Sequence, residues 1–173
     1  MRVQISLMLA TALALAPMGA RAQAPVACAA IDQGLPAPFA GWSAKAPLAS
    51  AAKVADLSKA LLVIGQGADA DLHPTSEVAY AALPEKPGGS VSHGGMFSLV
   101  VSQPGVYAVA LGSGAWIDLL KGKVAVESVA HGHGPDCSSI RKVVDFQLGP
   151  GRYVVQVSAD AEPKLAIMIA RRP

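Results

Sequence analysis

Short apolar runs separated by glycine- and proline-containing turns fill the chain from Leu61 onward, and this pattern constrains the fold most. The turns recur roughly every 8–12 residues, which is the spacing of strands in a β-sandwich or barrel. Apolar and polar residues alternate along 143–148 and 153–158, so one face of each strand would lie on a core. We therefore predict an all-β fold, a single antiparallel β-sandwich domain that spans residues 61–173.

The same pattern places the expected strands at residues 61–66, 77–83, 96–102, 106–111, 115–120, 124–129, 143–148, 153–158 and 165–170. Two pairs of strands have the same layout, because each is joined through a Pro-Gly turn (Pro104-Gly105 and Pro150-Gly151) and its second strand opens near a tyrosine. Proline presets φ and glycine supplies positive φ, so each pair predicts a tight hairpin. This layout resembles the hairpins of jelly-roll and galactose-binding-like domains, which implies a fold class only.

Residues 23–60 have a different composition from the rest. Prolines at 25, 36, 38 and 47 exclude a long helix, so we expect an irregular Pro/Ala-rich N-terminal segment. Phe39 and Trp42 are expected to anchor it on the sandwich, and the Ala-rich stretch 49–60 is either a short helix or a solvated linker.

The first 22 residues have the features of a cleavable secretory signal peptide. Arg2 precedes an apolar run over residues 3–16, and Ala20 and Ala22 place small residues at the positions that signal peptidase requires. The apolar run is shorter than the ~20 residues of a spanning helix. We predict cleavage near Ala22-Gln23, a periplasmic or secreted protein, and no membrane span in the mature chain.

Charge argues against nucleic acid as a partner. The chain has 14 Lys and Arg against 12 Asp and Glu. Removal of Arg2 and Arg21 with the signal peptide would leave 12 against 12, with no basic stripe. The expected partner is a small ligand or an unknown protein of the cell envelope.

The two cysteines, Cys28 and Cys137, are expected to form a disulfide. An even cysteine count in an oxidising compartment favours a bridge, which would close a loop of about 110 residues and tie the N-terminal segment to the sandwich. The alternative is two free thiols, one of them a metal ligand.

A His-Gly-His sequence marks the strongest candidate for a metal site. His131 and His133 can point to one side of an extended chain, Asp136 or Cys137 can add a ligand, and His93 is the remote candidate. Imidazole and carboxylate ligands suit Zn²⁺, Cu²⁺ or Fe²⁺. The alternative is a glycine-rich surface loop with solvated histidines.

Three weaker candidates carry charge or an aromatic ring. Arg141 could orient an anionic ligand with Lys142 as a second charge, or both could begin a solvated strand. Trp116 is either a buried strand residue or a platform for a sugar. Ser138, a histidine and Asp118 contain the residue types of a hydrolase, but no nucleophile elbow surrounds the serine.

Three stretches, residues 85–92, 115–118 and 131–142, are similar to a family of small exported proteobacterial proteins whose members often carry the name homogentisate 1,2-dioxygenase. The resemblance implies a non-haem Fe(II) enzyme that opens an aromatic ring. It would make His131, His133 and Asp136 the two-His-one-carboxylate ligands. In this chain the His-Gly-His sequence is followed by Asp136 and Cys137 rather than by the glutamate of a cupin site.

These features together predict an exported periplasmic β-sandwich that acts as a binding or accessory protein and binds a divalent metal through the His-Gly-His loop. A ring-cleaving Fe(II) dioxygenase and a structural cell-envelope interaction domain are the alternatives. The sequence assigns no catalytic residue.

Overall fold

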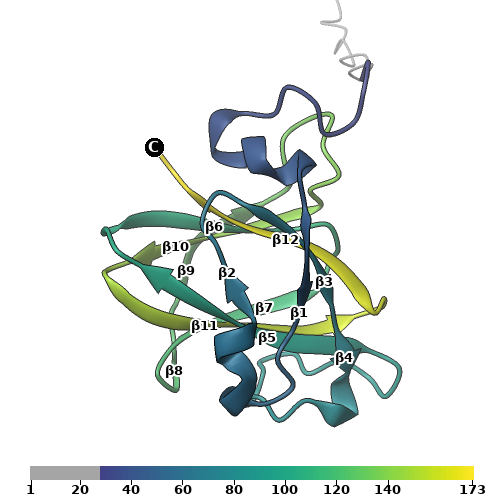
Figure 1. Cartoon of the computed structure of the whole chain (residues 1–173), viewed down its shortest axis with the longest axis vertical. Coiled ribbons are helices and arrows are strands. Elements are labelled where there is room, and N and C mark those ends of the chain that lie inside the picture. The colour runs from purple at the N-terminus through teal and green to yellow at the C-terminus, as the bar shows by residue number, and fades with distance from the viewer. Residues whose placement is uncertain (1–27) are drawn as a thin grey trace, which may run out of the picture.

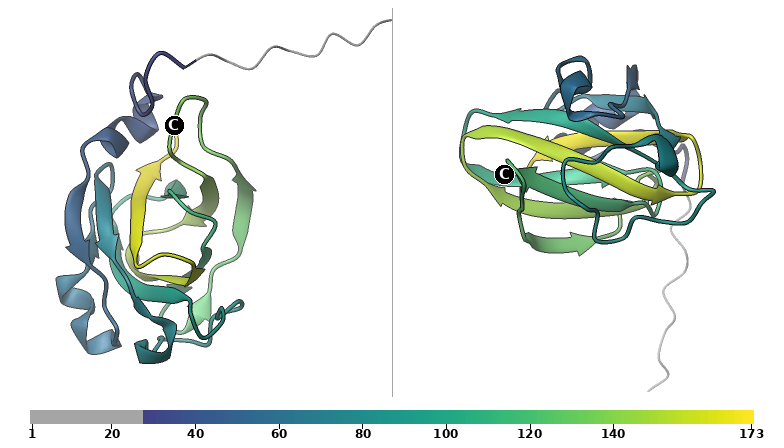
Figure 2. Two further views of the ribbon diagram at one scale, coloured as in Figure 1. Left: turned by 90° about the vertical axis from the view of Figure 1, so that its right-hand side faces the viewer. Right: turned by 90° about the horizontal axis from the view of Figure 1, so that it is seen from below.

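The computed structural model describes residues 28–173, so the predicted signal peptide lies outside the described residues. Two β-sheets face each other, and a short N-terminal segment packs on the outer surface of one of them (Figures 1 and 2). The prediction of an all-β sandwich is confirmed. Apart from strands, the described chain contains three 3₁₀ helices: η1 (Ala37–Ser43), η2 (Val54–Lys59) and η3 (Thr75–Glu77).

Sheet A has the order β1-β3-β12-β6-β10-β9, and sheet B has the order β2-β5-β11-β7-β8, with β4 also paired to β5. The strands of sheet A are β1 (Ala46–Ala49), β3 (Gly67–Asp71), β6 (Gly105–Leu111), β9 (Ser128–Gly132), β10 (Lys142–Leu148) and β12 (Lys164–Arg171). The strands of sheet B are β2 (Leu61–Leu62), β4 (His73–Pro74), β5 (His93–Val101), β7 (Trp116–Lys121), β8 (Val124–Ala125) and β11 (Gly151–Asp160). Pairing is antiparallel except for β1 with β3 and β2 with β5.

The main hydrophobic core lies between the two sheets. Alternate residues of the central strands face it, as the predicted period of two requires. Val155 and Val157 of β11 are fully buried there, opposite Val109 of β6 and Ile167 of β12. Burial of this apolar area stabilises the fold by roughly 25 cal/mol per Å².

The two predicted hairpins are wrong, and the correction defines the topology. The turn at Pro104-Gly105 connects β5 in sheet B to β6 in sheet A, and the turn at Pro150-Gly151 connects β10 in sheet A to β11 in sheet B. Each of these strands pairs instead with a strand from the other Pro-Gly connection: β5 pairs with β11, and β6 pairs with β10. Gly105 and Gly151 have φ values of 159° and 149°, which glycine adopts more readily than other residues. A reversal between layers needs the same residues as a hairpin, so the local sequence does not distinguish them.

The repeated tyrosines close both of these turns in the same way. The hydroxyl of Tyr107 donates to the carbonyl of Gln103, and the hydroxyl of Tyr153 donates to the carbonyl of Gly149, each at 2.8 Å. Both rings are buried in the main core. The similarity seen between the two stretches of sequence is therefore a repeated corner between the sheets.

The predicted strand at 77–83 is wrong as well. Residues 75–77 form η3, and the chain after it lies against β11 without joining the sheet. Gln156 of β11 replaces a strand partner, because its amide accepts from the backbone N–H of Ala82 at 3.1 Å and donates to the Ala82 carbonyl at 3.2 Å. Tyr80 also donates to the carbonyl of Val157. A polar position of β11 is thus buried, with both the oxygen and the nitrogen of its amide hydrogen-bonded.

The predicted strand at 124–129 is two strands in two sheets. β8 ends at Ala125 in sheet B and β9 begins at Ser128 in sheet A, so the chain between them crosses from one sheet to the other. This crossing lies at the edge of the sandwich, where it borders the cleft described below.

Part of the N-terminal segment belongs to the sandwich. β1, which includes Pro47, pairs in parallel with β3 at the edge of sheet A, where a proline is tolerated. Neither β1 nor β3 was expected, because Ala, Pro and Asp dominate their sequences and these residues are depleted in strands.

Phe39 and Trp42 of η1 anchor this segment on the outer face of sheet A, as predicted. Trp42 is 0% exposed and packs with small side chains of the central strands. Those side chains are Ala108 and Ala110 of β6 and Ala170 of β12. The alanines leave room for the indole, and the two aromatic rings form a second, smaller core.

Polar contacts and a disulfide fix the same segment to the loop between β9 and β10. Cys28 and Cys137 are bonded, with their Cα atoms 5.3 Å apart, which confirms the predicted bridge. Asp32 accepts hydrogen bonds from the N–H and the hydroxyl of Ser139, both at 2.6 Å. The indole N–H of Trp42 donates to the same hydroxyl at 2.9 Å. We call Cys28, Asp32, Phe39, Trp42 and Lys45 the N-terminal latch.

The latch changes the acidity of Asp32. Partial burial raises its pKa, but the two hydrogen bonds from Ser139 and the charge of Lys45 outweigh burial, so the pKa lies below its ordinary value. The carboxylate form therefore contributes to holding the segment in place.

The described part of the chain contains no helix with the length and apolar character that crossing a bilayer would require.

Candidate functional site: a cleft between the sheet edges

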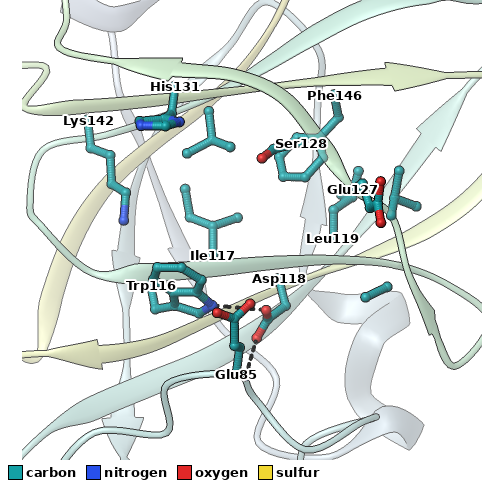
Figure 3. Close-up of a pocket in the computed structure, with 13 residues that line it drawn as sticks. Glu85, Trp116, Ile117, Asp118, Leu119, Glu127, Ser128, His131, Lys142 and Phe146 are labelled. Atoms are coloured by element: carbon teal, nitrogen blue, oxygen red, sulfur yellow. Dashed lines mark hydrogen bonds between the residues drawn. The ribbon is translucent and has the colours of Figure 1, made fainter.

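A cleft of about 610 Å³ opens where the β7–β8 edge of sheet B faces the β9–β10 edge of sheet A (Figure 3). We call it the edge cleft. It is lined by Glu85, Trp116, Ile117, Asp118, Leu119, Ala125, Val126, Glu127, Ser128, His131, Lys142, Val144 and Phe146.

The cleft exists because the outer edge of β7 is only partly covered. β8 pairs with Leu120 and Lys121 alone, and one further hydrogen bond joins Val126 N to Leu119 O at 2.7 Å. The crossing to β9 then leaves the stretch from Trp116 to Asp118 without a strand on that side. The space between the sheets is therefore open at this edge.

Apolar side chains of the main core form the floor of the cleft. Ile117 and Leu119 come from β7, and Val144 and Phe146 come from β10. All four are buried, with exposed fractions of 1–8%. The floor is thus a continuation of the core that reaches the surface.

Trp116 and Asp118 stand together at one end of the cleft. They are two residues apart on β7 and therefore share a face. The indole N–H of Trp116 donates to Asp118 at 3.0 Å, and the backbone N–H of Glu85 donates to the other oxygen of the same carboxylate at 3.3 Å. The carboxylate holds the partly exposed indole in a fixed orientation beside the opening.

Lys142 reaches this end from the opposite sheet. It begins β10, and its ammonium donates to the carbonyl of Ala115, just before β7, at 2.7 Å. Burial lowers the pKa of Lys142, and the nearby charge of Lys86 lowers it further. A cation is therefore held where desolvation and a like charge both oppose it.

A second lysine, Lys86, also has its ammonium group close to the Trp116 ring. The ammonium of Lys86 lies 4.2 Å from the centre of the Trp116 ring, and that of Lys142 lies 5.1 Å from it. Both distances are within the range of cation–π attraction. In the described chain the salt bridges belong to Lys45, Lys59, Lys164 and Arg172, so neither of these two lysines is paired with a carboxylate.

The opposite wall of the cleft is exposed and polar. Glu127, Ser128 and His131 line it from the crossing and from β9, every residue of which is exposed. In Figure 3 Glu127 lies at the far end from Lys142, and His131 lies near Lys142. The cleft thus has Lys142 together with the carboxylates of Asp118 and Glu85 around Trp116 at one end, an apolar floor, and Glu127 at the other end.

Of the residues predicted to bind a metal, His131 and His133 lie together. Both line a second cavity of about 530 Å³, which Lys142 also lines. Nδ1 of His133 lies 3.2 Å from the carbonyl of Arg141, within hydrogen-bond distance. Arg141 and Lys142 line this cavity too, and two cations oppose the binding of a divalent metal.

His93 and Asp136 do not complete a ligand set. His93 begins β5, which is separated from β7 by β11 in sheet B, whereas Asp136 is exposed in the loop before β10. Cys137 is in the disulfide. Across residues 28–173, no three His, Cys, Asp or Glu side chains form a group that could hold a metal ion.

Because no such group is seen among the described residues, we derive no chemical step through iron, and the iron centre stays a prediction. Metal binding by His131 and His133 with a ligand from elsewhere stays a prediction. Elemental analysis of protein purified without a His tag tests it.

The residues of a hydrolase are not assembled either. The hydroxyl of Ser138 donates to the carbonyl of Pro135 at 2.6 Å, and Asp118 is engaged by Trp116 and Glu85. Arg141, predicted to orient an anion, is exposed outside the edge cleft, whereas Lys142 beside it lines the cleft.

Sequence reasoning considered Trp116, His131 and Lys142 but did not bring them together, and it missed Lys86, Glu127 and Phe146. The alternation Lys142-Val144-Phe146 is a usable signal, because it puts a cation and two apolar residues on one face of a strand. No signal in the sequence indicated that Lys86 would lie over Trp116, 30 positions further along the chain.

No protein-family model matches the chain, and none of the curated proteins matches it.

Proposed function

We propose that this protein is an exported binding module that holds a small, largely apolar organic molecule in the edge cleft. One observation carries the proposal: a cleft of about 610 Å³ whose floor is made of buried core side chains. Ligand sites typically have volumes of ~300–1,000 Å³ and are mostly apolar with a few polar groups. The edge cleft has this size and this distribution of side chains.

Binding is favoured over catalysis because the polar groups of the cleft have structural partners. Asp118 accepts from the Trp116 indole and from the Glu85 backbone, and Lys142 donates to Ala115. A nucleophile in hydrogen-bond contact with a base is the usual mark of covalent catalysis. Among the described residues, the hydrogen bonds of the cleft contain no such pair.

Export is part of the proposal. The Cys28–Cys137 disulfide supports it, because disulfides persist in the periplasm and outside the cell, whereas the cytosol keeps thiols reduced. A purely structural envelope domain is the competing function, and it predicts no ligand in the cleft.

The test is titration of the purified protein with N-phenyl-1-naphthylamine, a neutral dye that fluoresces strongly in apolar sites. Ala125 lines the cleft and is exposed, so Ala125→Phe fills space there without disturbing the core. Ala130 is an exposed alanine of the neighbouring strand β9 that does not line the cleft, so Ala130→Phe is the matched control.

We expect saturable dye binding that Ala125→Phe weakens at least about tenfold, which corresponds to 1.4 kcal/mol. Ala130→Phe should bind the dye as the unaltered protein does. Absence of saturable binding, or equal effects of the two substitutions, would show that the edge cleft is not a binding site.

A further inference from the structure

We infer that the Lys142 end of the edge cleft is a subsite for the carboxylate of an amphipathic organic acid, whose apolar body lies along Val144 and Phe146. This inference rests on the proposed binding function and specifies the chemical class of the ligand.

The first support is the row of side chains on β10. Every second residue of this strand from its start lines the cleft: Lys142, Val144 and Phe146. Residues two apart on a strand are separated by roughly 6.6 Å, so the row spans about 13 Å from end to end. It presents one cation followed by two apolar side chains, which is complementary to an acidic head group on a hydrocarbon or aromatic body.

The second support is the pair of cations around Trp116. Lys86 and Lys142 approach the same indole, and neither is neutralised by a carboxylate in the described chain. Like charges held close together cost free energy unless an anion joins them. A ligand carboxylate in the cleft beside the Lys142 ammonium would accept a charge-assisted hydrogen bond, and the charge of Lys86 near the same ring favours an anion there.

The third support is the position of the acidic groups. Glu127 lies at the opposite end of the cleft from Lys142, and in Figure 3 the carboxylates of Glu85 and Asp118 lie beside the indole on the side away from the Lys142 ammonium. Asp118 is also held by two N–H donors. A ligand with one negative end is therefore repelled from the far end of the cleft and attracted to Lys142, which fixes its direction.

Octanoate and 1-octanol provide the test, because they have the same chain length and differ in the charge of the head group. Each is used to displace N-phenyl-1-naphthylamine from the purified protein at neutral pH and low salt. We expect octanoate to bind at least about tenfold more tightly than 1-octanol, a difference that added salt reduces.

Substitutions then test whether Lys142 is the source of the preference for octanoate over 1-octanol. Lys142→Met keeps the apolar stem and removes the charge, so octanoate should lose its advantage over 1-octanol, whereas Lys142→Arg should retain most of it. Lys86→Met is a second variant and should reduce the advantage by a smaller factor. Lys123→Met is the matched control, because Lys123 is exposed in the turn between β7 and β8 and is not a lining residue.

The outcomes separate the two proposals. Displacement by 1-octanol without any preference for octanoate, or a preference that survives Lys142→Met, overturns the subsite and leaves the binding function standing. Failure of the dye to bind at all overturns the binding function and the subsite with it.

Discussion

The two tryptophans of this protein have nearly the same local chemistry and opposite surroundings. Trp42 donates its indole N–H to Ser139 and has the ammonium of Lys45 4.9 Å from its ring centre. Trp116 donates its indole N–H to Asp118 and has two ammonium groups near its ring. Trp42 is completely buried in the N-terminal latch, whereas Trp116 remains partly exposed at the edge cleft.

The difference shows what each region contributes. In the latch, every polar group meets a partner from the chain itself: Lys45 donates to the Trp42 carbonyl at 3.0 Å and lies 4.0 Å from Asp32. At the cleft, Lys86 and Lys142 have no carboxylate partner within the described residues. The cations of the latch therefore include one close to a carboxylate, whereas those beside Trp116 have no carboxylate partner in the described chain and, under the proposed function, are open to the carboxylate of a ligand.

Replacing the two tryptophans by alanine should give the largest contrast. Trp42→Ala removes a fully buried indole, and we expect it to lower the free energy of unfolding by about 3–5 kcal/mol. Trp116→Ala removes a partly exposed ring and should cost about 1 kcal/mol. Urea denaturation followed by far-ultraviolet circular dichroism measures both values. If the two variants lost the same free energy of unfolding, the latch would not be the more stabilising of the two tryptophan sites.

Removing the disulfide should destabilise the N-terminal latch and leave ligand binding in the edge cleft unchanged. The bond joins residues 109 positions apart, and its loss through Cys28→Ser with Cys137→Ser should cost about 2–4 kcal/mol. The variant should still bind N-phenyl-1-naphthylamine as the unaltered protein does at a temperature where both are folded. A parallel loss of dye binding would show that the two regions act as one unit.

Acid should destabilise the latch through Asp32. Its pKa is lowered on folding, so the unfolded chain binds this proton more readily than the folded protein does. The stabilisation is present above the ordinary pKa of 3.8 and is lost as the pH falls through the lower folded-state pKa.

Asp32→Asn should therefore cost about 1 kcal/mol at neutral pH and reduce the fall of the melting temperature in acid. Asp136→Asn, which removes an exposed carboxylate of the adjoining loop, is the control and should change neither. A pH profile of Asp32→Asn that coincides with that of the unaltered protein would rule out this contribution.

The smallest effects are expected at the lysines beside the two tryptophans. Lys45→Met removes contacts with Trp42 and Asp32 and should cost about 1 kcal/mol. Lys142→Met loses one hydrogen bond but also relieves burial of a charge and repulsion from Lys86, so it should stay within about 0.5 kcal/mol of the unaltered protein. Thermal melts of the two variants compare them, and a larger loss for Lys142→Met would reverse the comparison.

Much of the fold could be predicted from local patterns. The alternation along 143–148 and 153–158 identified β10 and β11 and the residues that face the core, because a strand in contact with one core imposes a period of two. The cysteine count predicted the disulfide. Phe39 and Trp42 were expected to anchor the N-terminal segment, since large aromatic side chains in a proline-rich stretch are seldom left exposed.

The errors have one common cause, which is that local sequence does not specify the partner of a strand. Pro104-Gly105 and Pro150-Gly151 turn the chain as predicted, but they turn it between the sheets. Residues 124–129 contain one apolar run, yet they divide between two sheets. The edge cleft was not predicted for the same reason, because it brings together residues of β7 and β10 from different sheets.

The sequence by itself determined that the chain forms strands, which faces of the main strands are apolar, and that Cys28 and Cys137 can pair. These properties follow from the conformational preferences and polarity of neighbouring residues. Only the tertiary structure decided which edge of the sandwich stays open, and that Lys86, Trp116 and Lys142 meet there. Their meeting depends on pairings between distant segments, whose free energy comes from burial across the whole core and is not encoded at any one position.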